Sequence, residues 1–225
     1  GGEDGGVVIC DAVTGTPLRT LQGHRGRAYA VAFDSQGNLL ATGAADGTVR
    51  VWDLATGHTA HTHTVHPEGV WPVVVGPGPD PLIAAGAADG TIRLWDAATG
   101  ELRHELAGHT APVYTAVFDP NGSLMVTGDA GGTLRVWDLT TGALQRTLTG
   151  HRGAVFRAVF HPDGALLAAG DETGTVRLWD IHTGEIREEL LGHTGRVYAI
   201  AFHPDGELMV TGDTDGSVRL WEGAR

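Results

Sequence analysis

The chain has 225 residues and a formal net charge of −12, and its fifteen basic residues are all arginine. This charge disfavours nucleic acids and anionic membranes as partners, because both are bound mainly through basic side chains. The absence of lysine excludes a Walker-type phosphate loop and a Schiff-base enzyme. We therefore expect no cofactor, no nucleic-acid partner and no membrane partner.

The single cysteine, Cys10, excludes a disulfide within the chain. No apolar stretch approaches the roughly 18 residues of a membrane helix. The first residues show no charged segment followed by an apolar one, as a secretion signal would. These features predict a cytoplasmic protein.

The predicted elements are short strands that recur along the chain. Residues 4–11 align with the third strand of a unit and place Cys10 at its tryptophan position, where we expect it to be buried. Each later unit opens with an apolar stretch such as 197–202, followed by a tight turn and a second apolar stretch such as 208–212. A third strand then ends at Trp-Asp, or Trp-Glu in the last unit, and where the chain continues a polar fourth strand such as 101–106 follows.

Two residue types mark the repeat. The tryptophans that end the third strands are 43, 42, 42 and 42 residues apart, and a histidine opens each unit. They are Trp52, Trp95, Trp137, Trp179 and Trp221, with His24, His66, His109, His151 and His193. This pattern resembles the WD-repeat β-propeller family, of the bacterial type. The resemblance implies an all-β propeller of four-stranded antiparallel blades, with about five blades present and a partial one.

The expected boundaries follow the histidines. A partial blade covers 1–22, and successive repeats cover 23–65, 66–107, 108–149, 150–191 and 192–225 of one propeller domain or segment. Seven units would need about 294 residues, so we expect a segment of a seven-bladed ring. A closed five-bladed ring or a self-complementing oligomeric ring is the alternative, and an incomplete ring is expected to self-associate through its exposed sheets.

In this family a histidine, a hydroxyl, an aspartate and the tryptophan of one blade form a buried hydrogen-bonded network. The resemblance assigns this network to His24, Thr42, Asp46 and Trp52 in the first blade, and to His193, Thr211, Asp215 and Trp221 in the fifth. The middle blades depart from it. The second retains His66, Asp89 and Trp95 but has Ala85 at the hydroxyl position, and the third retains His109, Thr127 and Trp137 but has Gly131 at the aspartate position. The fourth retains His151 and Trp179 and has Ala169 and Thr173 at the hydroxyl and aspartate positions. We interpret these histidines and aspartates as structural.

The sequence contains no typical catalytic nucleophile. Its three serines, Ser35, Ser123 and Ser217, fall in or beside predicted turns and outside any Gly-x-Ser-x-Gly motif. His61 and His63 lie two positions apart on a predicted fourth strand, so they face the same side and form a weak candidate for a surface zinc or nickel site. A solvated outer strand is the simpler interpretation.

An aromatic residue stands five positions after each histidine: Tyr29, Trp71, Tyr114, Phe156 and Tyr198. Packing between blades is one interpretation of this series. The resemblance implies another, in which this end of the inner strand belongs to the top face that binds partners. Arg27, Arg157, Arg196, Glu172 and Thr214 would then flank the aromatic residues, and tyrosine, tryptophan and arginine dominate binding hot spots.

We therefore predict a non-catalytic scaffold for protein–protein interaction, of the kind used in signalling, that binds a protein or peptide on the top face. One alternative is a structural or engineered self-assembling propeller unit without a natural ligand. The other is a propeller enzyme with a site in its channel, which would need converging carboxylates and histidines.

Overall fold

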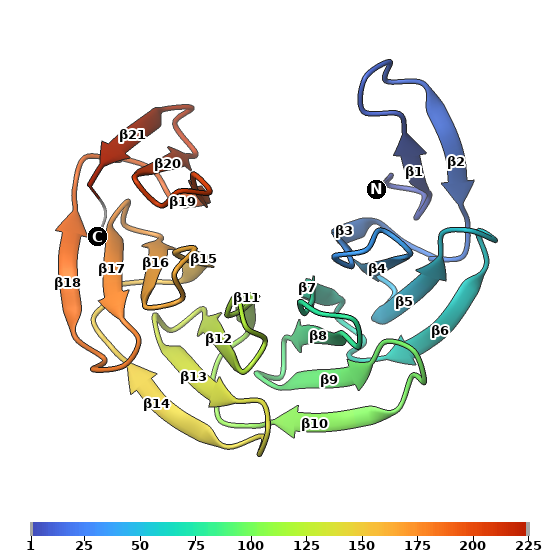
Figure 1. Cartoon of the computed structure of the whole chain (residues 1–225), viewed down its shortest axis with the longest axis horizontal. Coiled ribbons are helices and arrows are strands. Elements are labelled where there is room, and N and C mark those ends of the chain that lie inside the picture. The colour runs from blue at the N-terminus through green and yellow to red at the C-terminus, as the bar shows by residue number, and fades with distance from the viewer. Residues whose placement is uncertain (1, 224–225) are drawn as a thin grey trace. The chain divides into compact units, whose positions relative to one another are not determined.

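The computed structural model describes residues 2–223, and within that range every regular element is a β-strand. The strands form six antiparallel sheets, and strands that are consecutive in sequence are neighbours in each sheet (Figure 1). This confirms the predicted all-β architecture of four-stranded antiparallel blades. No helix in the described residues is long and apolar enough to cross a membrane.

Four sheets have four strands each, and we call them blades 1 to 4 in chain order. Blade 1 consists of β3 (Ala28–Phe33), β4 (Leu39–Ala44), β5 (Thr48–Asp53) and β6 (Thr59–Thr64). Blade 2 consists of β7 (Val70–Val75), β8 (Leu82–Ala87), β9 (Ile92–Asp96) and β10 (Leu102–Leu106). Blade 3 consists of β11 (Val113–Phe118), β12 (Leu124–Asp129), β13 (Leu134–Asp138) and β14 (Leu144–Leu148). Blade 4 consists of β15 (Val155–Phe160), β16 (Leu166–Asp171), β17 (Val176–Asp180) and β18 (Ile186–Leu190).

The first and last sheets are smaller. The N-terminal sheet pairs β1 (Val7–Cys10) with β2 (Pro17–Leu21), and blade 5 contains β19 (Val197–Phe202), β20 (Leu208–Asp213) and β21 (Val218–Glu222). Cys10 is exposed, so the prediction that it is buried is wrong. The physical reason is that the N-terminal sheet contains only two strands, and the end of β1 lacks the neighbouring strand that covers each tryptophan in the larger blades.

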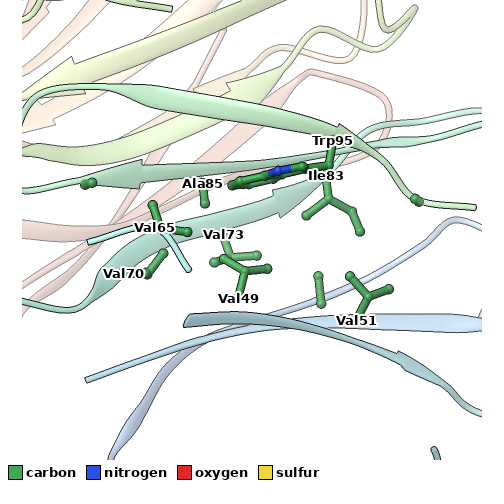
Figure 2. Close-up of a cluster of buried hydrophobic side chains, with 11 residues drawn as sticks. Val49, Val51, Val65, Val70, Val73, Ile83, Ala85 and Trp95 are labelled. Atoms are coloured by element: carbon green, nitrogen blue, oxygen red, sulfur yellow. The ribbon is translucent and has the colours of Figure 1, made fainter. Parts of the chain in front are cut away.

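The chain divides into two compact units, with the boundary between Glu105 and Leu106. In the first unit, Val49 and Val51 of β5 pack against Val73 and Ile83 of blade 2 (Figure 2). All four side chains are at most 4% exposed, so the apolar side chains between blades 1 and 2 are removed from water. Each of these blades therefore depends on its neighbour to bury this face.

The second unit repeats this packing. Val126 and Val136 of blade 3 join Val155 and Leu167 of blade 4 in one apolar cluster. In blades 1 to 4 the third strand ends in aspartate, and this residue closes the turn to the fourth strand. Asp138 Oδ1 accepts the backbone N–H groups of Thr140 and Thr141, both at 2.9 Å. The aspartate of each Trp-Asp pair therefore acts locally, as a turn-forming residue.

The inner strand of every blade contains a register shift at its start. In blade 3, Val113 pairs with Asp129 and Thr115 pairs with Gly128, which leaves Tyr114 without a cross-strand position. The same irregularity occurs in the other four blades. A bulge of this kind turns the extra side chain out of the regular alternation of the strand, and in each blade the shift includes the aromatic residue of the predicted series.

Candidate functional site

The buried polar network is complete in blade 3. The Trp137 indole N–H donates to Thr127 Oγ1 at 2.8 Å, and this hydroxyl lies 2.7 Å from His109 Nε2. The other ring nitrogen, Nδ1, lies 2.7 Å from Asp129 Oδ2. Because a carboxylate only accepts, Nδ1 carries the proton, and the hydroxyl donates to Nε2 while it accepts from the indole. Every polar group of the network is thereby satisfied.

The aspartate of this network stands two positions before the one that the sequence alignment indicates. Blade 3 has Gly131 at the expected position, but Asp129, the last residue of β12, supplies the carboxylate. In blade 5 the expected Asp215 is wrong for the same reason: His193 Nδ1 lies 2.9 Å from Asp213, whereas Asp215 accepts from the Thr194 hydroxyl. The missed signal is a Gly-Asp pair that ends the second strand of blades 3, 4 and 5.

Blades 1 and 5 have the predicted histidine, hydroxyl and tryptophan. In blade 1, His24 Nε2 is 2.7 Å from Thr42 Oγ1, Trp52 donates to the same hydroxyl at 2.9 Å, and Asp46 lies 3.3 Å from His24 Nδ1. In blade 5, Thr211 Oγ1 lies 2.6 Å from His193 Nε2 and accepts the Trp221 N–H at 2.8 Å.

Blade 2 departs from the network assigned to His66, Asp89 and Trp95, because Ala85 supplies no hydroxyl and the three residues contact other partners. His66 Nδ1 accepts the Glu68 N–H at 3.3 Å, and Asp89 binds the Thr91 hydroxyl. Trp95 is buried by stacking, with its ring centroid 4.6 Å from that of His63. Stacking thus occupies the place that hydrogen bonding has in the other blades.

Blade 4 lacks the hydroxyl at Ala169 and recruits an arginine that sequence reasoning missed. The Trp179 indole donates directly to His151 Nε2 at 3.4 Å, and His151 Nδ1 lies 2.9 Å from Asp171. Arg177, only 3% exposed, donates to Asp171 at 2.9 Å and to Glu189 at 2.7 Å. Burial raises the pKa of Asp171, but hydrogen bonds from His151 and Thr173 outweigh it and hold the pKa below the ordinary value. Thr173, predicted at the aspartate position, contributes one of these bonds.

His61 and His63 face the same side of β6, as predicted, and their rings are 6.1 Å apart. His61 Nε2 lies 3.0 Å from the carbonyl oxygen of Ala98, and His63 stacks on Trp95. Burial lowers the pKa of His63, with the His61 charge as a second cause. The described residues contain no group of three or more side chains placed to hold a metal ion. Both rings therefore contribute to packing of the outer strand.

The five aromatic residues at the bulges form two clusters, one in each unit. In the first unit, Tyr29 and Trp71 meet edge to face with ring centroids 5.9 Å apart. In the second unit, Phe156 lies between Tyr114 and Tyr198, with centroids 5.4 Å and 4.5 Å away. Tyr29 and Tyr198 are 53% and 50% exposed, and the other three are half-buried. The rings therefore contact one another and also present apolar surface to solvent.

Charged side chains flank the cluster of the second unit. The Arg196 guanidinium carbon lies 5.7 Å from the Phe156 ring centroid, and the same guanidinium forms an ion pair with Glu172 at 2.9 Å. The Thr214 hydroxyl accepts the Arg196 backbone N–H at 3.0 Å. A hydrogen bond with Tyr198 raises the pKa of Arg196, with Glu172 as the next cause. Arg157 is exposed on the adjoining strand.

Arg27, the flanking residue of the first unit, is more loosely held. Its guanidinium reaches Glu3 at 3.9 Å, and both side chains are largely exposed. The structure therefore brings Arg196, Glu172 and Thr214 together with the aromatic residues, as the sequence predicts, and places Arg27 in a weak surface ion pair.

Sheets of four antiparallel strands, each with an aspartate-closed turn and most with a histidine–tryptophan network, define a WD-type β-propeller protein. The chain belongs to the WD domain, G-beta repeat family, which it matches over residues 15–53, 54–96, 100–138, 142–180 and 184–222. Its sequence is 34% identical to that of the computationally designed Ika8 protein, and the two structures agree with a TM-score of 0.86 over 99% of this chain and 66% of that one.

Similar natural proteins are eukaryotic and much longer than the matched region. U3 small nucleolar RNA-associated protein 21 homolog of Schizosaccharomyces pombe is 43% identical over 56 residues, which are 25% of this chain and 6% of that protein. Serine-threonine kinase receptor-associated protein of Gallus gallus is 37% identical over 75 residues, 33% of this chain and 19% of its own length. Eukaryotic translation initiation factor 3 subunit I of Pyricularia oryzae is 35% identical over 60 residues, which are 27% of this chain and 18% of that protein. These relatives give no support to the expected bacterial type.

Proposed function

We propose that this chain is a non-catalytic interaction module that binds a protein or peptide segment through its aromatic bulge residues. The observation that carries the proposal is the stack of Tyr114, Phe156 and Tyr198 with Arg196 over the central ring. Contacts restrict the side chains of the cluster, because each ring packs against another and the Arg196 guanidinium pairs with Glu172. Side chains that already contact one another lose less conformational entropy when a partner binds.

The chemistry of the cluster suits a segment with apolar or aromatic side chains and at least one acceptor group. Tyrosine and arginine are enriched at hot spots because they bury a large area and also form hydrogen bonds. The bulges support this role, since they remove the aromatic side chains from the alternation that packs the blades.

The histidines and aspartates support the same proposal, because the hydrogen bonds of the buried networks already use their side chains. In blade 3 both ring nitrogens of His109 are held by Thr127 and Asp129, and the histidine is 6% exposed. Burial lowers the pKa of His109, so the neutral ring is favoured. A general base needs access to substrate, and this ring is enclosed.

The names of the similar proteins describe members of assemblies: a receptor-associated protein, a subunit of a translation initiation factor and a small nucleolar RNA-associated protein. By analogy we extend the proposal to a scaffold role in the cytoplasm, including signalling assemblies. The similarity to a designed propeller favours a second candidate, a self-assembling structural unit without a separate ligand.

The test uses the chain as bait for a displayed library of random peptides, followed by affinity measurements on the selected sequences. Tyr198→Ala should weaken binding by about 30-fold, which corresponds to the 2 kcal/mol typical of a hot spot. The control is Leu144→Ala, which removes an exposed apolar side chain from the outer strand of blade 3 and should change nothing. Equal affinities of the two variants, or no selected peptide, would count against the proposal.

A further inference from the structure

Blade 5 has an apolar face that no described residue covers. Val210, Val218 and Leu220 are 38%, 73% and 64% exposed. The equivalent side chains of blade 4 are Ala168, Val176 and Leu178, which are at most 1% exposed beneath blade 5. Two hollows, of about 300 and 270 Å³, lie on the uncovered face, the first lined by Val210 and Val218 and the second by Val210 and Leu220. Such a patch of apolar side chains is typical of an interaction surface.

A glycine in blade 5 independently indicates that another sheet packs on this face. At Gly43 and Gly170, an added Cβ would lie 2.6 Å from a valine of the following blade, so a side chain is excluded there. Gly212 is the equivalent residue of blade 5, but its nearest contact would be Ala199 of its own blade at 3.5 Å. The sequence thus retains, at Gly212, the residue that a closely packed neighbouring sheet requires.

The other end of the chain has a complementary surface on blade 1. Val31 and Phe33 of β3 are 52% and 56% exposed, whereas Val73, the equivalent of Val31 in blade 2, is 4% exposed. The preceding N-terminal sheet has only two strands, and it covers the outer part of blade 1, where Val7 packs with Leu40 and Trp52. The exposed residues lie where inner strands of a preceding blade would pack.

Strand β2 has the sequence and register of a fourth strand for β21. Its residues Pro-Leu-Arg-Thr-Leu resemble Leu-Gln-Arg-Thr-Leu of β14, and β21 resembles β13, the partner of β14. On β1, Thr20 pairs with Val8 and Arg19 with Ile9, as Thr147 pairs with Arg135 and Arg146 with Val136 in blade 3. Arg19 also donates to the carbonyl of Leu54 at 3.1 Å, which anchors β2 on blade 1.

We propose that the uncovered face of blade 5 is occupied by blade 1 of a second copy of this chain, with β21 taking the place of β1 beside β2 of that copy. Val218 and Leu220 then take the positions of Val7 and Ile9, and Arg219 pairs with Thr20. This arrangement gives β21 its fourth strand and covers Val31 and Phe33 with β19 and β20. It is a head-to-tail contact between copies.

One observation favours a second copy as the occupant. The chain carries both complementary surfaces, since blade 5 exposes Val218 and Leu220 while blade 1 exposes Val31 and Phe33. The β2 strand also matches a fourth strand for β21 in sequence and register. Closure of β2 on β21 within one chain and capture of a different protein are the outcomes that the following experiments separate.

The first experiment measures the molar mass of the 225-residue chain by light scattering over a hundredfold range of concentration. The expected mass rises above 23.5 kDa, in steps of one chain. Leu220→Asp should return the chain to a monomer, because it places a charge in the new contact while Leu220 is already exposed in one copy. Val13→Asp is the matched control at a residue that is 94% exposed outside both surfaces, and it should leave the assembly intact.

The second experiment tests the strand pairing directly. Chains with Cys10→Ser and Thr20→Cys are mixed with chains carrying Cys10→Ser and Arg219→Cys and then oxidised. Residues opposite each other in an antiparallel pair are about 4.5–5.5 Å apart, within the range of a disulfide. We expect a two-chain band on a non-reducing gel, and no such band when Thr147→Cys of β14 replaces Thr20→Cys.

Three results would overturn the proposal. A monomer at all concentrations with no cross-link excludes association through this face. A chain carrying both cysteines that cross-links only within itself shows that β21 closes on its own β2. An oligomer that survives Leu220→Asp and gives no cross-link forms through another surface. None of these results depends on peptide binding by the aromatic cluster, so the two proposals fail separately.

Discussion

Substitution of Thr127 by valine tests whether the buried network stabilises a blade. Valine has the shape of threonine, so the change creates no cavity at a residue that is fully buried. It removes the hydroxyl that accepts from Trp137 and contacts His109 Nε2, and leaves both groups without a partner. Each buried group that loses its hydrogen bond costs about 1–3 kcal/mol. Because groups in one network are not additive, we expect a total of about 2–4 kcal/mol.

The assay is thermal unfolding followed by circular dichroism. For a chain of this size 1 kcal/mol shifts the midpoint by about 2–4 °C, so Thr127→Val should lower it by about 5–15 °C. Thr127→Ser retains the hydroxyl and should cost only about 1 kcal/mol for the lost methyl group. Thr147→Val makes the same change at an exposed residue of the same blade and should stay within about 0.5 kcal/mol. If Thr127→Val unfolds at the same temperature as Thr147→Val, the network does not stabilise the blade.

Three further predictions concern charge and access. Burial lowers the pKa of His109 below 6.5, so the unfolded chain binds more protons and stability must fall as the pH drops from 7 through 6.5. Urea unfolding at pH 7 and pH 5.5 should therefore show a smaller loss of unfolding free energy in His109→Gln than in the unchanged chain, by at most about 1.4 kcal/mol per pH unit. An equal dependence of the unfolding free energy on pH in both chains would refute the assignment. Arg177→Met leaves the buried Asp171 carboxylate with one donor fewer and should cost about 3 kcal/mol. Arg187→Met removes an ion pair whose arginine is half-exposed and should cost clearly less. Similar midpoints in urea for both variants would show that burial does not matter here. Cys10 is exposed and should react fully with a thiol reagent without denaturant, and a thiol that reacts only after unfolding would contradict its placement.

The blades show which features can be read from sequence. The tryptophans and histidines recur at constant spacing, and a constant spacing together with alternating apolar residues specifies strands, turns and the faces that are buried. The aromatic series was predicted from the same spacing, although the bulge that exposes Tyr114 depends on how β11 pairs with β12. Register between strands is a property of two segments, and one segment's pattern does not reveal it.

The errors at the network have a physical reason. Asp213 and Asp215 are two positions apart, so strand periodicity places both on one side, and only the geometry of the turn decides which carboxylate reaches His193. The arginine of the third strand recurs in every blade, as at Arg135 and Arg219. Arg177 joins the buried network of blade 4 because it donates to Asp171, the last residue of β16, and to Glu189 opposite. Blade 2 also lacks the hydroxyl, but it has Ala87 at the position of Asp171.

The sequence by itself determined the all-β repeat, the positions of the strands and the residues that mark each blade, because these follow from local periodicity and turn chemistry. The tertiary structure alone decided which aspartate completes each network and that Cys10 is exposed. It also decided that, within residues 2–223, Val176 and Leu178 are covered by a neighbouring blade while Val218 and Leu220 are not. These outcomes depend on which sheet lies beside which, and identical local patterns give different burial when the neighbouring sheet is absent.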